Sequence, residues 1–154
     1  MDNNKFTITA DLSEEYEVSL DGTMYVSGFS GTGNGYFNRS DVLDFCEKAK
    51  VLSETMTGLA ELRGTLGNQD GTTFLETFIV RIYPLSNSKL NGVVGVHITL
   101  GDYPSSDCRE EEKMKVSGEL QTRNQHIMKF SDDIRKLLSG EISIVTLDKG
   151  LDLI

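Results

Sequence analysis

The chain has 154 residues, a length that suits one domain, and its 38% apolar and 25% charged residues are typical of a folded globular protein. Its 24 acidic residues outnumber its 15 basic residues, and the formal charge of -9 repels phosphate backbones and anionic membranes but attracts basic surfaces. These values argue against nucleic acid or a membrane as the direct partner, and we expect a single domain over residues 1–154.

The start of the chain, its apolar runs and its cysteines bear on the compartment that we expect for the protein. The first residues lack the apolar core of a signal peptide, and no apolar run approaches the roughly 20 residues that span a bilayer, so we expect a cytoplasmic protein. Cys46 and Cys108 are too few for a disulfide framework and lie in no metal-ligating spacing. Cys46 falls on the apolar side of a predicted helix, whereas Cys108 lies in a polar segment, and its reactivity stays open.

Alternating apolar and polar residues predict strands in the first part of the chain. Residues 6–12 and 16–20 alternate with period two, and a further apolar run follows. We expect a three-residue turn at 21–23, because this turn sets Leu20 opposite Met24 and keeps the apolar side chains on one face.

A glycine-rich stretch at 28–35 precedes a predicted helix, as a phosphate-binding loop does. However, Tyr36 stands where the third glycine of a dinucleotide fingerprint belongs, no Gly-Lys-Ser/Thr follows, and the neighbouring strands look antiparallel. We therefore interpret residues 28–35 as a flexible connection and expect no cofactor.

Two segments have helical periodicity. The first, at 41–56, follows Ser40 as a natural N-cap, and the second, at 124–139, is followed by Gly140 as a stop. Each has a single apolar stripe that should be buried. The stripes consist of Val42, Phe45, Cys46, Ala49, Leu52 and Met56 in the first helix, and of Ile127, Phe130, Ile134, Leu137 and Leu138 in the second.

Strands separated by turn residues fill the segment between the two helices. We expect them at 60–66, 74–85, 93–100 and 114–120, with a last short strand within 142–147. Strands that follow one another with short turns imply an antiparallel sheet. The predicted fold is α+β, with a curved antiparallel sheet of about six to seven strands and two helices packed on one face.

No residue pattern nominates a reaction, so we expect a binding protein rather than an enzyme. No Gly-x-Ser-x-Gly nucleophile motif occurs, and metal sites usually need three or more ligands. His97, Asp102 and Asp107 leave a small metal-dependent hydrolase as one alternative. A small-ligand-binding or structural module, using the space between sheet and helices, is another.

Acidic residues cluster in two parts of the chain. Residues 1–37 hold six acids and one base, and residues 102–112 hold five acids and one base. Solvation explains either cluster alone, but clusters that converged in space would form an anionic patch able to attract a basic protein. The candidate partner-binding residues are Glu14, Glu15, Glu17, Asp107, Glu110, Glu111 and Glu112.

A series of short motifs extends over about residues 24–138. It consists of Tyr36, Phe37, Asp41, Val42, Leu43, Phe45, Leu52, Gly58, Leu59, Ala60, Glu61, Leu62, Gly92, Val94, Val96, Gln121, Thr122, Gln125, Phe130, Ile134, Leu137 and Leu138. This series resembles small bacterial immunity proteins related to the immunity protein of the WapA toxin. The resemblance implies a cytoplasmic antidote that binds a cognate toxin domain, often a nuclease, and masks its active cleft. The candidate residues rest on charge alone, and we expect exposed aromatics such as Tyr83 or Tyr103 to assist them.

Overall fold

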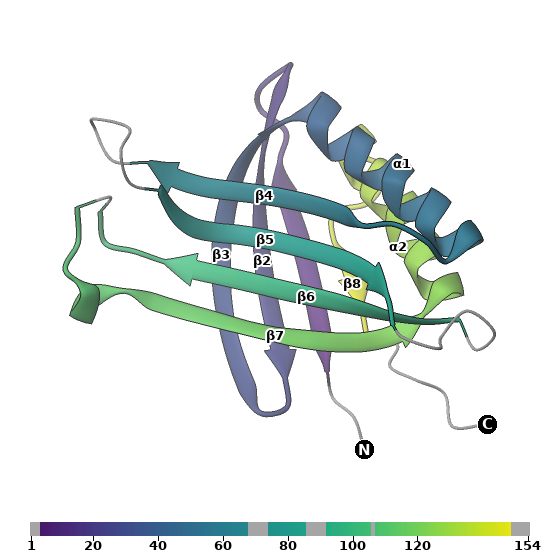
Figure 1. The fold of residues 1–154 in the computed structure, drawn as a ribbon. Coiled ribbons are helices and arrows are strands. Elements are labelled where there is room, and N and C mark those ends of the chain that lie inside the picture. The colour runs from purple at the N-terminus through teal and green to yellow at the C-terminus, as the bar shows by residue number, and fades with distance from the viewer. Residues whose placement is uncertain (1–3, 68–73, 86–91, 106, 149–154) are drawn as a thin grey trace.

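The described residues fold into eight strands, two α-helices and a short 3-10 helix, η1 (Figure 1). This computed structural model describes residues 4–67, 74–85, 92–105 and 107–148. The elements in chain order are β1 (Lys5–Asp11), β2 (Glu17–Val26), β3 (Phe29–Asn38), α1 (Arg39–Thr55), β4 (Ala60–Gly67), β5 (Phe74–Pro84), β6 (Val93–Asp102), η1 (Glu110–Glu112), β7 (Met114–Arg123), α2 (Asn124–Ser139) and β8 (Val145–Leu147). The expected α+β class is confirmed.

The described strands form two antiparallel sheets of four strands each, in place of the expected single curved sheet of six to seven strands. The first sheet has the order β3-β2-β1-β8, and the second sheet has the order β4-β5-β6-β7. The second sheet confirms the predicted meander, because each of its strands pairs with the next one in the chain. The short last strand, β8, pairs with β1 and forms the edge of the first sheet opposite β3.

β3 crosses the whole second sheet. It contacts each of β4, β5, β6 and β7, and Figure 1 shows β2 and β3 running crosswise behind those four strands. At inner positions 31 and 33 of β3, a side chain would prevent so close an approach. A Cβ on Gly33 would collide with the carbonyl oxygen of Thr77, and one on Gly31 would lie 2.5 Å from the side chain of Val116. Glycine at alternate positions therefore lets the two sheets touch.

The glycine-rich stretch at 28–35 belongs to a hairpin, so its interpretation as a flexible connection is wrong. A two-residue turn at Ser27 and Gly28, with φ of 54° and 85°, joins β2 to β3. From Phe29 onward the chain pairs with β2 over ten residues. The expectation failed because glycine usually marks turns, whereas here it relieves a clash between two sheets.

The expected turn at 21–23 is also wrong, because these residues lie inside β2. They pair with residues 32–34 on one side and residues 7–9 on the other. The glycine of this segment again serves packing, since a Cβ on Gly22 would lie 2.8 Å from the ring of Phe78. The chain reverses earlier, in the segment between β1 and β2.

Both predicted helices are confirmed, and every residue of their apolar stripes is buried. α2 occupies the expected residues 124–139 and ends at Gly140, which has a φ of 81°. α1 begins slightly earlier than expected, with Asn38 rather than Ser40 at its N-cap position and no side-chain cap. The helical period predicted which residues are buried. The first residue of α1, in contrast, depends on where β3 ends, because α1 follows β3 directly.

The two helices join the sheets into one core. α1 contacts β3, β4 and β5, α2 contacts β1, β7 and β8, and the helices contact each other. Phe6 of β1 lies at the centre, because its ring centroid is 6.2 Å from that of Phe78 in the second sheet and 6.2 Å from that of Phe130 in α2. Among the described residues, no helix has the length and apolarity that a membrane span requires.

Candidate functional site

The first group of candidate acids lies next to the C-terminal end of β3. Glu14 and Glu15 are exposed in the segment between β1 and β2, and Glu17 is exposed at the start of β2. Arg39, the first residue of α1, holds this segment in place by donating hydrogen bonds to the carbonyl oxygens of Glu14 (2.6 Å) and Leu12 (3.2 Å). The three carboxylates therefore stay in solvent while their backbone is anchored.

The second group of candidate acids lies on η1, between β6 and β7, and is partly neutralised there. Arg109 Nε lies 2.9 Å from a carboxylate oxygen of Glu112, and Lys113 Nζ lies 2.8 Å from one of Glu110. The hydrogen bond from Lys113 lowers the pKa of Glu110 from its ordinary value. Glu111 has a more distant basic neighbour, since Arg109 Nη1 lies 3.9 Å from its carboxylate.

The structure does not bring the two acidic groups together. Figure 1 shows η1 and the segment between β1 and β2 at different ends of the molecule. Asp107 is exposed just before η1 and belongs to that end, whereas Asp2 lies outside the described residues. The acids therefore form two separate clusters rather than one continuous patch.

The residues of the alternative metal site are also apart. His97 lies within β6 with its Nε2 3.3 Å from the hydroxyl oxygen of Ser117, whereas Asp102 ends that strand and Asp107 follows in the next loop. Within residues 4–67, 74–85, 92–105 and 107–148, no three His, Cys, Asp or Glu side chains are placed to hold a metal ion.

A groove follows β3 where this strand meets the second sheet. One cleft of about 640 Å³ lies between residues 21–23 and 32–36 of the first sheet and the ends of β4, β5 and β6. A second cleft of about 270 Å³ shares Thr32 and Asp102 with it and continues towards the start of β7. We call the two clefts together the β3 groove. The larger one carries the carboxylates of Asp21 and Asp102, and no Lys, Arg or His is among the described residues that line it.

β3 is a free edge of the first sheet, since β2 is its only neighbour in that sheet. The two-residue turn makes Val26 and Phe29 a hydrogen-bonded pair, and such pairs alternate along antiparallel strands. Every second residue of β3 therefore directs its N–H and C=O away from β2. These residues are Ser30, Thr32, Asn34, Tyr36 and Asn38.

The edge formed by β3 differs from the other long edges because none of its ten residues is charged. β4 carries Glu61 and Arg63 together with a β-bulge, and β7 carries Lys115 and Glu119. Charged side chains and bulges are the usual protection of an exposed edge against pairing with another chain. β3 has neither of these devices.

Exposed aromatic side chains surround β3. Phe29 at its start is 71% exposed, Tyr36 near its end is 60% exposed, and Tyr25 on β2 is 41% exposed. Tyr16, just before β2, is 76% exposed and accepts a backbone hydrogen bond from Arg39 at its carbonyl oxygen. Tyrosine is enriched at protein interfaces, because it offers a large contact area and a polar hydroxyl.

The two aromatic residues named from the sequence, Tyr83 and Tyr103, are half-buried. Tyr83 lies on β5, whereas Tyr103 follows β6 directly and lines the larger cleft of the β3 groove. The hydroxyl of Tyr83 donates to the carboxylate of Glu119 at 2.6 Å, and that of Tyr103 donates to the carbonyl oxygen of Glu76 at 3.1 Å. Tyr25 and Tyr36 are more exposed, and they occupy polar positions in the alternation of their strands. That signal was hidden at Tyr36 by the interpretation of its neighbours as a loop.

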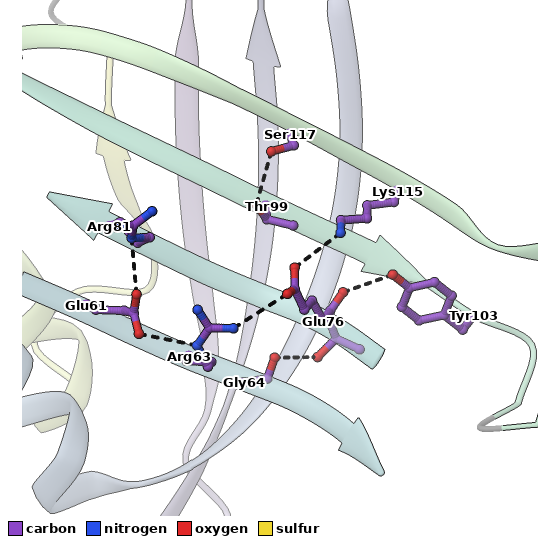
Figure 2. Close-up of polar contacts among 10 residues, drawn as sticks. Glu61, Arg63, Gly64, Glu76, Arg81, Thr99, Tyr103, Lys115 and Ser117 are labelled. Carbon is purple, nitrogen blue, oxygen red and sulfur yellow. Dashed lines mark hydrogen bonds and ion pairs between the residues drawn. The ribbon is translucent and has the colours of Figure 1, made fainter. Parts of the chain in front are cut away.

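The outer face of the second sheet carries charges that are already paired with one another. Figure 2 shows Glu61 between Arg63 and Arg81, at 3.2 and 3.1 Å, and Glu76 between Arg63 and Lys115, at 3.6 and 3.1 Å. Exposed pairs of this kind contribute little to stability. Each of these two carboxylates has two basic partners. This face therefore attracts a basic protein less than the larger cleft of the β3 groove does, which is lined by two carboxylates and, among the described residues, by no base.

The buried thiol of Cys46 is a poor nucleophile, because burial raises its pKa to about 12. Comparisons of the chain with known protein families, curated proteins and solved structures gave no match.

Proposed function

We propose that the chain is a cytoplasmic, non-catalytic immunity protein that binds a basic bacterial toxin domain, such as a nuclease, and masks its active cleft. The observation that carries this proposal is the combination of exposed aromatic side chains with the carboxylates of Asp21 and Asp102 around the β3 groove. Protein interfaces commonly combine aromatic anchors with charges complementary to those of the partner.

The first acidic group supports this assignment by its position. Glu14, Glu15 and Glu17 adjoin the end of β3, because the backbone N–H of Arg39 donates to the carbonyl oxygen of Tyr16 at 2.9 Å. A partner seated over Tyr36 would therefore meet these carboxylates at the rim of the contact. Charges at a rim mainly accelerate association and orient the partner.

The second acidic group has a different role in this proposal. The acids on η1 lie at a different end of the molecule from the segment between β1 and β2, and they are partly neutralised by Arg109 and Lys113. They add to the long-range attraction of a basic protein rather than to the central contact. Their effect should therefore fall strongly with salt, since the Debye length is only about 8 Å at physiological ionic strength.

Co-expression tests the proposal directly. A gene for a secreted toxin should lie beside the gene of this chain, and the chain should restore growth to cells that express the C-terminal domain of that toxin. Tyr36→Ala should weaken binding of the purified toxin domain by roughly thirtyfold, as loss of an interface hot spot does. Leu59→Ala changes a side chain that is 48% exposed before β4 and serves as the control with unchanged affinity. Growth arrest despite full expression of the chain would reject the proposal.

Charge reversal separates the two acidic groups. Replacing Glu14, Glu15 and Glu17 by Lys should slow association and also speed dissociation, because these residues border the contact. Replacing Glu110, Glu111 and Glu112 by Lys should slow association only, and the difference from wild type should vanish at high salt. An association rate of the wild-type chain that is the same at low and high salt would contradict the electrostatic part of the proposal.

A cleft between α2 and β8 favours a second candidate function, the binding of a small ligand. Its volume is about 570 Å³, within the usual range for ligand pockets, and Phe130, Ile142 and Ile144 line it. The buried Nε2 of His126, which also lines the cleft, has no hydrogen-bond partner among the described residues. A thermal-shift screen in which one metabolite class stabilises the chain, but not an Ile144→Lys variant, would support this function.

A further inference from the structure

The ends of the second sheet extend past β3 and form one wall of the β3 groove. Figure 1 shows β4, β5, β6 and β7 continuing beyond the point where β3 crosses them. Thr77 and Gly101 line this wall where the backbones approach most closely, and Val116 lines the narrower cleft. The free edge of β3 forms the adjacent wall. The groove therefore follows the length of a strand.

We propose that the β3 groove binds an extended segment of the partner, rich in Lys or Arg, as an additional strand of the first sheet. This inference rests on the proposed function and names the element of the toxin domain that the chain holds. The segment pairs with β3 through its backbone and contacts the ends of the second sheet with every other side chain. Addition of a strand to a free sheet edge is a common mode of peptide recognition.

The backbone of β3 supplies the pairing groups. Ser30, Thr32, Asn34 and Tyr36 each direct an N–H and a C=O into the groove, and no hydrogen bond from the described residues reaches these groups. Unpaired N–H and C=O groups along an edge form a template for another strand. The exposed length is sufficient for about four residues of the partner to pair at alternate positions.

The charges around the groove select a basic occupant. Asn34 donates to the carboxylate of Asp21 at 2.8 Å and keeps it beside the edge, and Asp102 lies at the junction of the two clefts. Lys115, the base that lines the narrower cleft, already contacts Glu76 at 3.1 Å. Lysine or arginine on the outward face of an added strand can reach Asp21, whereas an acidic segment would be repelled.

A second copy of the chain does not fit the groove. If two β3 edges paired around a two-fold axis, the overhanging ends of both second sheets would lie on the same face and occupy the same space. Each copy also carries a formal charge of -9, and the two would repel each other. The groove therefore suits one isolated strand better than a whole second sheet.

Synthetic peptides test the inference on the purified chain. The probe is Thr-Lys-Val-Lys-Val-Lys-Val-Thr, and two controls replace its lysines by Glu or methylate its backbone nitrogens at every second residue. We expect the lysine peptide to shift the amide signals of Ser30, Thr32, Asn34 and Tyr36 and to slow their hydrogen exchange. Both controls should bind at least ~tenfold more weakly, because one reverses the charge and the other removes the pairing groups.

A proline variant tests the same contact from the side of the chain. Thr32→Pro removes an N–H that makes no bond to β2, so the ladder of the first sheet is kept. Its affinity for the lysine peptide should fall at least ~tenfold, whereas Thr32→Ser should bind as wild type does. If the proline variant does not fold, the methylated peptide still gives the answer, because it alters only the probe.

The failures of the two proposals are distinguishable. Equal affinity of the methylated and unmethylated peptides, signal shifts confined to other surfaces, or self-association through β3 would each overturn the added-strand inference. Growth protection by Thr32→Pro equal to that of the wild-type chain would also overturn it and leave the proposed function intact. Failure of the wild-type chain to protect cells would instead reject the proposed function.

Discussion

Replacement of Gly33 by Ala tests the tightest contact of the fold. The added Cβ would collide with the carbonyl oxygen of Thr77 and would lie 3.0 Å from the backbone nitrogen of Gly101 and 3.0 Å from Cβ of Leu100. Two of these neighbours are backbone atoms within a sheet, so they cannot turn aside as a flexible side chain can. Overpacking of a core typically lowers the free energy of unfolding by 1–3 kcal/mol, and we expect a loss of about 3 kcal/mol here.

Gly118→Ala is the matched control. The nearest neighbours of its added Cβ would be Cε of Met24 at 3.7 Å and Cγ1 of Val26 at 3.9 Å, which are ordinary contacts. With no clash, the alanine mainly restricts the unfolded chain and should stabilise the protein by roughly 0.4–1 kcal/mol. The two variants should then differ by about 4 kcal/mol, or roughly 8–15 °C in Tm for a chain of this size.

Urea unfolding followed by far-UV circular dichroism and calorimetric measurement of Tm give the two free energies. Equal denaturant slopes for both variants would show that the comparison concerns the folded state. If Gly33→Ala were within about 1 kcal/mol of Gly118→Ala, the sheets would not meet through the backbone of β3, and the steric account of its glycines would be refuted.

Three further predictions concern single side chains. Arg39→Ala removes four hydrogen bonds from the guanidinium to backbone carbonyl oxygens. Urea titrations should show a loss of about 2–3 kcal/mol in the free energy of unfolding. The exposed control Lys48→Ala should change this free energy by less than ~0.5 kcal/mol. A thiol reagent such as Ellman's should modify Cys108 in the native chain but Cys46 only on unfolding, because burial raises the pKa of Cys46 to about 12; two fast thiols in the native chain would contradict this. Burial, aided by Glu119, raises the pKa of Tyr83 from 10.0 to about 12, so the stability from its protonated hydroxyl is present below pH 10 and is lost as the pH rises towards 12. Tyr83→Phe should make the measured decline in stability between these pH values shallower, and an unchanged decline would count against the assignment.

Periodicity predicted the helices and most strands because it reports which side of an element is buried. The stripe from Val42 to Met56 is buried as expected, and α2 has the predicted bounds. Period two cannot report what covers the buried side of a strand. The apolar residues on the buried side of β1 and β6 are therefore compatible with two arrangements. One is a single sheet covered by two helices, and the other is two sheets that cross. The number of sheets became clear only from the contacts of β3 with β4 to β7.

The glycines at 31, 33 and 35 were misinterpreted for a specific reason. Glycine in sequence usually indicates freedom of the backbone, but here it indicates the absence of room for a side chain. The alternation of these glycines with Thr32 and Asn34 was the available signal of a strand.

The candidate site depended on spatial proximity that the sequence does not contain. The two acidic clusters are visible in the sequence as runs of residues, but their separation in space is set by the connections around β6 and η1. The acids on η1 also have basic neighbours three residues away, and the summed charge of a segment hides such pairs. The edge position of β3 likewise follows from the sheet order and from no local pattern.

The lack of charge on the free edge of β3 is the strongest functional signal in the molecule, because the fold does not require it. Packing against the second sheet fixes only the inward positions, where Gly33 and Gly35 leave no space for a side chain. The alternate residues, from Ser30 to Tyr36, face outward and are exposed, so the core would tolerate lysine or glutamate there as it does on β4 and β7. Because no steric reason explains the missing charges, the unprotected edge supports the proposal that β3 pairs with another chain.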